Sequence, residues 1–332
     1  MGLTLGYKAS AEQFGPRELL DYSVLAEQLG LDSVAISDHF QPWRHNTGHA
    51  PNSLVWLGAL GQATERVVLA TSVLTPTFRL HPSIVAQAFG TLGALFPGRV
   101  VLGIGTGEAM NETPATGLVW PGAKERRLRL AESVELMRRL WTEERVTFKG
   151  DYYSTDRATI YDRPDEPVPI YIAAWAPLAT KYAGRAGDGF ICTSGKEPDL
   201  YRERIGNLEE GAASAGRDAG SIERVIEIKV SYDADVDYAK DACRWWAALS
   251  LSAEEKSGVD DPVEMERLAD AAADRAHSRF IVSSDADDVV EQIETYVDLG
   301  FTHLIFHAPG EDQPRFLKQF CADIVPRLRD RW

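Results

Sequence analysis

The sequence contains few cysteines, no long apolar run and no excess of basic residues. The three cysteines, Cys192, Cys243 and Cys321, form no CxxC pair, which argues against a disulfide framework and a thiolate zinc site. No apolar run approaches the roughly 20 residues of a transmembrane helix. The N-terminal MGLTLGYKAS lacks the basic and apolar segments of a signal peptide. We therefore expect a cytoplasmic protein with no membrane partner.

The charge balance is strongly acidic. Lys and Arg number 35 against 50 Asp and Glu, which gives a formal net charge of -15. Nucleic acids and anionic membranes both require a broad basic face, so neither is an expected partner. Salt screens such a long-range charge within about 10 Å. A few cations gathered in one pocket can therefore still bind an anionic small molecule.

Short apolar runs alternate with helical patterns such as 16–29 and 124–141 along most of the chain. Several runs are rich in β-branched residues, which is typical of parallel strands covered on both faces. The eight candidates are Leu3–Tyr7, Ser33–Ser37, Val67–Ser72, Val100–Gly105, Ile170–Ala173, Gly189–Thr193, Val225–Ser231 and His303–His307. The alternation predicts an α/β fold, a single (β/α)8 barrel of the TIM type, over residues 1–332 as one domain. A doubly wound open sheet is the alternative.

Two segments interrupt this alternation. Residues 145–169, after the fourth strand, contain the turn-rich DYY and RPDEP and predict an inserted hairpin or loop. Residues 251–278, after the seventh strand, indicate a helical insertion with loops. We find no internal repeat.

Polar residues follow several predicted strands at the same end, where barrel enzymes carry their active sites. They include Asp38-His39, Thr75, Thr106-Gly107-Glu108, Thr193 to Lys196, and His307. The loop after His39 adds Trp43, His45 and His49, but their spacing fits no standard metal motif. We therefore predict an active site at this end and no metal.

Two glycine-containing segments match nucleotide-binding loops only in part. In GIGTGEAMNE the third glycine comes too early for a dinucleotide fingerprint. We interpret it as a strand end that lets a ligand approach the backbone, with Glu108 projecting from it. CTSGK lacks the Walker spacing, and its lysine is either solvated or part of a phosphate-binding turn.

Taken together, seven segments closely resemble one family. They are GYKASAEQFGPREL, SDHFQPWRHNTGHAP, TSVLTPTFR, LGIGTGEAMNE, KYAGRAGDGFICTSGK, DDPVEME and HLIFHAPG. The family is that of the F420-dependent glucose-6-phosphate dehydrogenases of actinobacteria, which are luciferase-like barrels. The resemblance covers nearly the whole chain. It implies hydride transfer from C1 of glucose 6-phosphate to C5 of coenzyme F420, giving 6-phosphogluconolactone and reduced coenzyme, and it implies a homodimer.

The resemblance also implies site residues. His39 and Glu108 match the acid/base pair, and Glu12 and Trp43 line the same pocket. The positions that match coenzyme contacts are Asp38, Ser72, Val73, Thr75, Thr106, Gly107, Asn111, Trp175, Ala176, Leu178 and Ala179, with a cis peptide between Ser72 and Val73. The positions that match the phosphate grip are Thr193, Lys196, Lys256 and Arg279. One segment departs from the family, because Trp175-Ala176 replaces a pair of glycines. The coenzyme contacts there, and the strictness for glucose among hexose 6-phosphates, are therefore open.

The roles of the acid/base pair follow from ordinary pKa values. His39, with an unperturbed pKa near 6.5, is suited to accept the C1 hydroxyl proton. Glu108, kept protonated by an apolar site, would then neutralise charge that develops on the coenzyme. The reverse assignment is an alternative. So are an FMN-dependent monooxygenase, an F420-dependent alcohol dehydrogenase and a non-catalytic coenzyme-binding protein. A phosphate grip of three cations favours the sugar-phosphate enzyme over an alcohol dehydrogenase.

Overall fold

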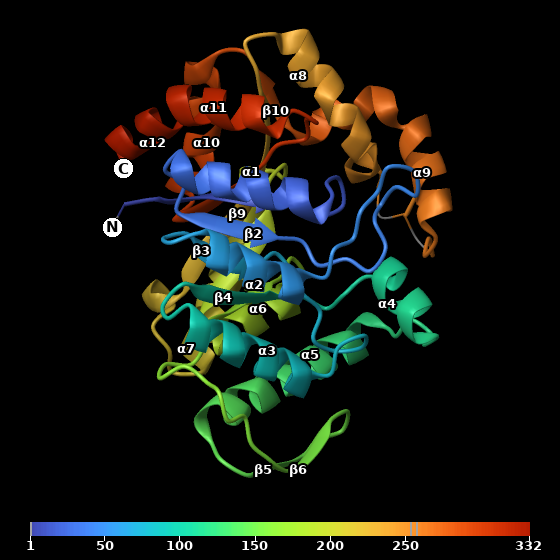
Figure 1. Ribbon diagram of the computed structural model, residues 1–332, viewed down its shortest axis with the longest axis vertical. Helices are drawn as coiled ribbons and strands as arrows, with labels where there is room; N and C mark the ends of the chain where they lie inside the picture. The colour runs from blue at the N-terminus through green and yellow to red at the C-terminus, as the bar shows by residue number, and fades with distance from the viewer. Residues whose placement is uncertain (1, 253, 257) are drawn as a thin grey trace.

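Eight parallel strands form a closed barrel in the computed structural model, which describes residues 2–252, 254–256 and 258–332 (Figure 1). Around the barrel the strands run β9-β11-β1-β2-β3-β4-β7-β8, and β8 pairs with β9 to close the ring. Their bounds are β1 Thr4–Ala9, β2 Ser33–Ile36, β3 Val68–Thr71, β4 Val100–Ile104, β7 Ile170–Ala173, β8 Gly189–Thr193, β9 Glu223–Tyr232 and β11 His303–His307. This closure confirms the predicted barrel and rules out the open sheet.

The predicted strands agree closely with the observed ones. β7, β8 and β11 have the predicted bounds, whereas β1 and β9 extend beyond theirs. One short strand, β10 (Ile281–Ser283), pairs in parallel with the last three residues of β9 and was not among the eight candidates. Three residues carry too little periodicity to be recognised as a strand.

Helices cover the outside of the barrel. The α-helices are α1 Pro16–Gln28, α2 Ser53–Ala63, α3 Pro82–Leu95, α4 Ala109–Thr116, α5 Ala123–Thr142, α6 Pro177–Ala186, α7 Pro198–Ser214, α8 Val236–Ala242, α9 Pro262–Ala271, α10 Ala286–Asp298, α11 Gln313–Asp323 and α12 Val325–Arg331, and the 3-10 helices are η1 Ala219–Ser221, η2 Cys243–Ser250 and η3 Ala273–Arg279. Many begin with proline. Its missing N–H carries no cost there, because N–H groups in the first turn have no partner within the helix. None of the described helices has the length and apolar character needed to cross a membrane.

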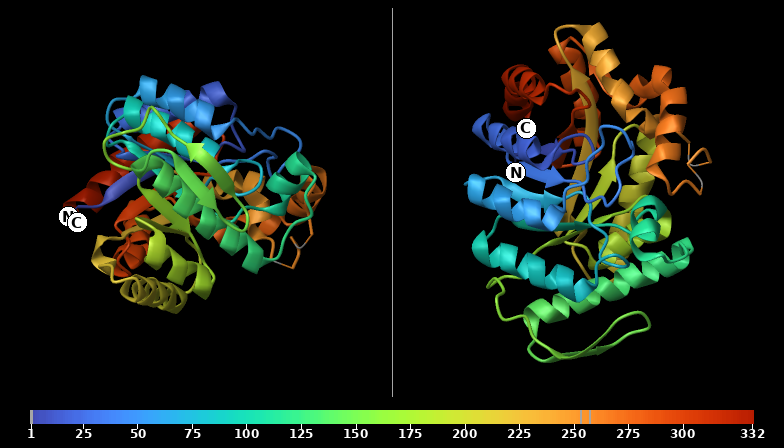
Figure 2. Two further views of the ribbon diagram at one scale, coloured as in Figure 1. Left: turned by 90° about the horizontal axis from the view of Figure 1, so that it is seen from below. Right: turned by 45° about the vertical axis from the view of Figure 1, so that its right-hand side comes forward.

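The two insertions take the predicted forms. The first is an antiparallel hairpin of β5 (Val146–Lys149) and β6 (Ser154–Ala158). The Glu132 carboxylate on α5 accepts N–H groups from 151–153 and anchors the hairpin to that helix. Residues 251–278 contain α9 and most of η3, whereas α8 and η2 lie between β9 and this segment. Figure 2 shows its helices on the same side of the barrel as α4.

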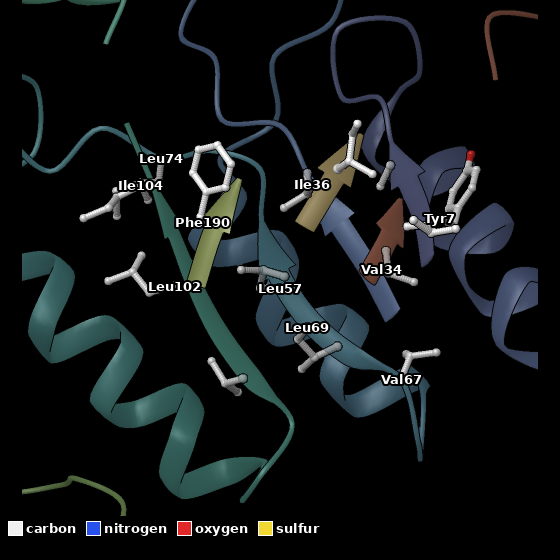
Figure 3. Close-up of a cluster of buried hydrophobic side chains, with 14 of the residues drawn as sticks. Tyr7, Val34, Ile36, Leu57, Val67, Leu69, Leu74, Leu102, Ile104 and Phe190 are labelled. Atoms are coloured by element: carbon white, nitrogen blue, oxygen red, sulfur yellow. The ribbon is translucent and has the colours of Figure 1, made fainter. Parts of the chain in front are cut away.

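The core has two layers. Alternate strand residues such as Val34, Ile36 and Leu69 face the helices and are fully buried (Figure 3). The intervening residues point into the barrel, where a smaller apolar cluster fills the interior with Ala35, Ala70, Val101, Ile191, Val225 and Ile305. The barrel is therefore a packed support for whatever lies at its carboxyl end.

Candidate active site

A cavity of about 500 Å³ lies at the carboxyl ends of the barrel strands. Most of the predicted site residues line it, namely Glu12, Asp38, His39, Trp43, Ser72, Val73, Thr75, Thr106, Gly107, Glu108, Asn111, Trp175, Thr193, Lys196, Lys256 and Arg279. Ligand pockets commonly have this size and combine apolar walls with a few converging polar groups. The structure thus gathers residues from distant parts of the chain into one candidate site.

Three residues predicted to contact the coenzyme lie outside this cavity. Ala176 is the N-cap of α6, and Leu178 and Ala179 lie in its first turn. The side chain of Leu178 points outward and is 60% exposed. A contact with these residues would therefore involve the backbone N–H groups of the first turn, which lack partners within the helix.

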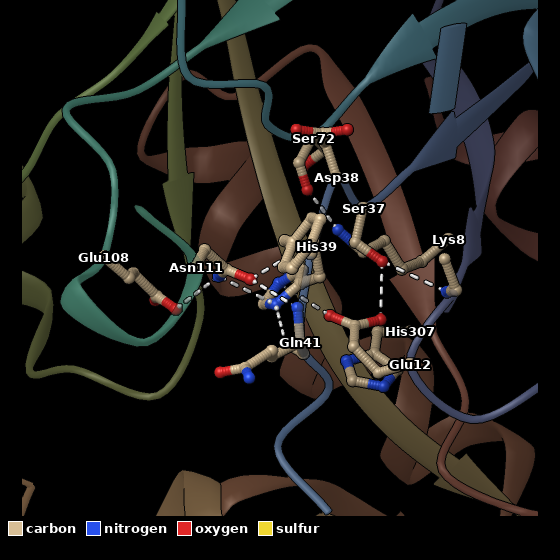
Figure 4. Close-up of polar contacts among 12 residues, drawn as sticks. Lys8, Glu12, Ser37, Asp38, His39, Gln41, Ser72, Glu108, Asn111 and His307 are labelled. Carbon is tan, nitrogen blue, oxygen red and sulfur yellow. Dashed lines mark hydrogen bonds and ion pairs between the residues drawn. The ribbon is translucent and has the colours of Figure 1, made fainter. Parts of the chain in front are cut away.

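His39 and Glu12 form a buried pair at one wall of the cavity (Figure 4). His39 Nε2 lies 3.0 Å from Glu12 Oε1, and the Ser37 hydroxyl donates to Glu12 Oε2 at 2.5 Å. Both carboxylate oxygens of Glu12 are thereby engaged. Glu12 therefore orients the His39 ring, and it also lines the cavity.

Each member of this pair shifts the pKa of the other. Burial alone would raise the pKa of Glu12, but the His39 charge and hydrogen bond, with Lys8 and Ser37, lower it to about 2. Burial alone would lower the pKa of His39, but Glu12, followed by Glu108 and Asp38, raises it to about 9. His39 is therefore a cation at neutral pH, which does not fit a resting base.

Asn111 lies between His39 and Glu108. Its Oδ1 accepts the backbone N–H groups of Phe40 and Gln41, which fixes the orientation of the amide. Its Nδ2 then lies 3.1 Å from His39 Nδ1 and 3.4 Å from Glu108 Oε2. His39 Nδ1 also lies 3.3 Å from the Gln41 carbonyl oxygen.

These neighbours give Nδ1 of His39 a partner in either protonation state. A protonated Nδ1 can donate to the Gln41 carbonyl, and an unprotonated Nδ1 can accept from the Asn111 amide. Nε2 faces the Glu12 carboxylate in both states. His39 Nδ1 can therefore be satisfied with or without a proton.

Asp38 is held rigidly beside the pair. Its carboxylate accepts from the Ser53 hydroxyl at 2.7 Å and from Arg79 Nη2 at 2.6 Å. Opposite, Gly107 has φ +80°, and a Cβ there would lie 2.9 Å from Thr75 Cγ2. Only glycine permits this close approach of the two loops.

The Ser72–Val73 peptide bond is cis, as the resemblance implies. Val73 shares the apolar part of the cavity wall with Ala173, Ala174 and Ile191. The polar part carries Thr75, Thr106 and Asp38. The apolar part of the wall fits the face of a planar ring, and the polar part fits the ring's polar edge and a hydroxylated side chain.

The cations predicted to grip phosphate converge on another wall. Lys256 Nζ lies 4.8 Å from the centre of the Trp43 ring. Burial lowers the pKa of Lys256 against the effect of Glu108, and the nearby Arg279 and Lys196 lower it further. Such mutual repulsion marks a site that an anion would stabilise.

The turn that carries Lys196 is fixed by Tyr201. The Tyr201 hydroxyl donates to the Thr193 carbonyl at 2.8 Å and accepts the Lys196 N–H at 3.2 Å. Gly195 has φ +85°, and a Cβ there would lie 3.7 Å from Arg279 Nη2. The turn and Arg279 are therefore direct neighbours.

Trp175 occupies the wall next to this turn. Its ring packs edge-on against Tyr201 with centroids 5.3 Å apart, and the Arg204 guanidinium lies 5.5 Å from its centre. The indole is thus accommodated by packing, and it faces the cavity with its remaining surface.

Sequence reasoning missed the charged residues deeper in the barrel. Lys8, Glu227 and Lys229 also line the cavity, together with His307, which was noted only as a polar strand end. A signal was present in EIKVS, where Glu227 and Lys229 alternate with apolar residues and so point to the same face of the strand. Among the described residues, no group of three metal-ligating side chains is placed to hold a metal ion.

Comparison with known proteins gives one consistent set of relatives. Residues 3–303 match the family model described as luciferase-like monooxygenase. The chain is 63% identical to an F420-dependent glucose-6-phosphate dehydrogenase of Intrasporangium calvum, over 98% of this chain and 99% of that protein. It is 60% identical to the enzyme of the same name from Nakamurella multipartita, over 98% and 97%.

Solved structures show the same architecture. An F420-dependent secondary alcohol dehydrogenase in complex with an F420-acetone adduct has a TM-score of 0.93 at 37% identity, covering 99% of this chain and all of that one. A coenzyme F420-dependent tetrahydromethanopterin reductase from Methanopyrus kandleri has a TM-score of 0.80 at 21% identity, covering 99% of this chain and all of that one, and supports the fold alone.

Proposed function

We propose that this chain, which belongs to the luciferase-like monooxygenase family, is an F420-dependent glucose-6-phosphate dehydrogenase. The observation that carries the proposal is a single cavity that combines the His39 and Glu108 acid/base pair with Lys196, Lys256 and Arg279. The enzymes 58–63% identical to it over nearly their whole length carry that name. The reaction oxidises C1 of glucose 6-phosphate to 6-phosphogluconolactone.

The coenzyme would lie along the wall formed by Asp38, Val73, Thr75, Thr106 and Asn111. When bound, F420 supplies a deazaflavin ring whose C5 accepts a hydride from the sugar. Asp38 can accept a hydroxyl of the coenzyme side chain, since each of its oxygens has bonding capacity left beyond Ser53 and Arg79. The backbone N–H groups at the start of α6 can hold a phosphate group.

The geometry favours the reverse of the acid/base assignment based on ordinary pKa values. Glu12 keeps His39 protonated at neutral pH, so His39 serves as the acid and donates from Nδ1. The Glu108 side chain is exposed to the cavity, and no cationic nitrogen lies within 4 Å of its carboxylate among the described residues. Glu108 then accepts the proton of the C1 hydroxyl.

Thr193, Lys196, Lys256 and Arg279 hold the sugar phosphate through charge-assisted hydrogen bonds. This binding energy is realised away from the reacting carbon and positions C1 over the coenzyme ring. Trp43 and Glu12 complete the pocket, Trp43 by contact and Glu12 by orienting His39.

The deciding experiment follows the visible absorbance of oxidised F420 with the purified protein. Glucose 6-phosphate should bleach it, with mannose 6-phosphate and fructose 6-phosphate as measures of strictness. Isopropanol tests the alternative that the chain is an alcohol dehydrogenase. It is chosen because the 37% identical solved structure is a secondary alcohol dehydrogenase. Bleaching with isopropanol alone would refute the proposal.

We further propose a single-domain, cytoplasmic homodimer. The cysteines Cys192, Cys243 and Cys321 are all free, which suits a reducing compartment. Exposed apolar side chains on the adjacent helices α2 and α3, among them Val55, Leu95 and Ile84, offer a surface for a second copy. Light scattering of the purified protein tests the dimer, and a monomer would refute it.

A further inference from the structure

The inner end of the cavity carries a charged cluster that the proposed reaction does not use. It consists of Lys8 on β1, Glu227 and Lys229 on β9, and His307 on β11, which are neighbouring strands. Each of the four is no more than 8% exposed. We call these four residues the floor cluster.

Within the floor cluster, Glu227 is committed to Lys8. Glu227 Oε2 lies 2.9 Å from Lys8 Nζ, whereas Glu227 Oε1 lies 3.7 Å from Lys229 Nζ and 3.6 Å from His307 Nδ1. Lys8 also donates to the Ser72 carbonyl oxygen at 2.5 Å. Among the described residues, none forms a hydrogen bond with Lys229 Nζ, and Lys229 lines the cavity.

The charges of the floor cluster do not cancel. One carboxylate faces two lysines, and burial lowers the pKa of His307, which favours the uncharged imidazole. Burial lowers the pKa of Lys229 to about 8 against the effect of Glu227, with Arg279 and Lys8 lowering it further. A buried cation that lacks a hydrogen-bonded counter-ion is destabilising unless a ligand pairs with it.

Lys229 lies directly beside the phosphate-binding turn. Its backbone N–H donates to the Ser194 hydroxyl at 3.0 Å, and the Ser194 N–H donates to the Glu227 carbonyl at 2.9 Å. On its other side, Arg279 shortly precedes β10, which pairs with β9 from Val230 onward. Lys229 is therefore joined through its backbone to the turn that bears Lys196, and it is near enough to Arg279 for the two charges to repel.

We propose that Lys229 is a further substrate-binding residue whose Nζ donates to the sugar phosphate from the inner side of the grip. The proposal rests on the proposed function in that the ligand is a sugar phosphate. The anion supplies the acceptor that Lys229 Nζ lacks, and the excess positive charge of the floor cluster is then neutralised.

The test compares the wild-type holoenzyme with Lys229→Met, which keeps the length of the side chain and removes its charge. One lost charge-assisted hydrogen bond should raise the KM for glucose 6-phosphate about ten- to a hundredfold. The inhibition constant of inorganic phosphate should rise by a similar factor. The affinity for F420, measured by quenching of its fluorescence, should remain within about twofold.

Lys240→Met is the matched control, because Lys240 is an exposed lysine on α8. It should leave the KM and the phosphate inhibition constant at their wild-type values. Unchanged values in Lys229→Met would overturn the proposal. A wild-type protein that does not bleach F420 with glucose 6-phosphate refutes the proposed function instead, and phosphate binding by calorimetry still distinguishes the variants.

A second measurement uses the wild-type chain and so does not depend on the variant folding. Reductive methylation of lysines, followed by mass spectrometry, reports how fast Lys229 reacts. Inorganic phosphate should slow this reaction at least about threefold while leaving Lys240 unaffected. Equal rates with and without phosphate would exclude Lys229 from the anion site.

Discussion

Replacing Glu12 with glutamine should leave His39 mostly unprotonated, and therefore uncharged, at neutral pH. The pKa of His39 is about 9 in the structure against an ordinary value of 6.5, mainly because the Glu12 carboxylate outweighs burial. The difference corresponds to roughly 3 kcal/mol in favour of the protonated form. Without the carboxylate only burial and weaker neighbours remain, and burial lowers the pKa of a histidine.

The consequence for turnover can be calculated. In Glu12→Gln a pKa at or below 6.5 leaves about one His39 in ten or fewer protonated at pH 7.5. If His39 is the acid, kcat at pH 7.5 falls at least about tenfold, and the alkaline limb of its pH profile moves from about pH 9 to below 6.5. Activity should recover as the pH is lowered.

Two assays separate this result from general damage. Turnover is followed by the absorbance of F420, and the titration of His39 is followed by proton NMR of the coenzyme-free protein, with His39→Gln identifying its signal. Glu27→Gln is the matched control, because Glu27 is also 8% or less exposed but binds the backbone of residues 65–67. A Glu12→Gln enzyme that is faster than wild type at pH 7.5 would show instead that the neutral imidazole is the active form.

The same pair predicts how stability depends on pH. His39 has a raised pKa in the folded state, so its contribution is complete below pH 6.5 and is lost as pH rises through about 9. Glu12 has a lowered pKa, so its contribution is complete above pH 4.5 and is lost as pH falls toward about 2. The gap in Tm between wild type and Glu12→Gln should therefore be greatest between pH 4.5 and 6.5, and a gap that widens above pH 9 would contradict the pairing.

Three further substitutions test other parts of the molecule. Lys256→Met should raise the KM for glucose 6-phosphate about tenfold or more while leaving F420 affinity unchanged, and an unchanged KM would remove Lys256 from the phosphate grip. Asn111→Ser removes the donor opposite His39 Nδ1, so the alkaline limb of kcat should move upward, opposite to Glu12→Gln; a downward shift would contradict that role. Phe190→Ala empties a fully buried position and should lower the free energy of unfolding in urea by about 3–5 kcal/mol, and a loss under about 1 kcal/mol would contradict the packing.

The barrel could be predicted from the sequence because parallel strands covered on both faces are continuously apolar. Ile170–Ala173 and His303–His307 have the same bounds in prediction and structure. Strand ends were less certain where polar residues belong to the strand, as Glu223 does at the start of β9. Hydrogen bonding across the sheet sets these bounds, and composition alone does not reveal it.

The site could be predicted only in part. Polar residues at strand ends indicated its position, but the pKa of His39 depends on the carboxylate of Glu12, which comes from the loop after another strand. The inward direction of Lys8 and Lys229 was missed because the side chains inside such barrels are usually branched and apolar. Charges that pair or repel across the barrel become visible only once the strands are closed.

Trp175 shows how a departure from the family pattern is absorbed. Two glycines would leave the wall between β7 and α6 open, whereas the indole fills it by packing on Tyr201 and beneath Arg204. Tyr201 in turn holds the turn of Thr193 and Lys196 through its hydroxyl. Trp175 therefore also supports the turn that bears Thr193 and Lys196. For this reason the effect of a change at Trp175 should be measured on the affinities for F420 and for glucose 6-phosphate together, since the proposed coenzyme and phosphate sites would share this wall.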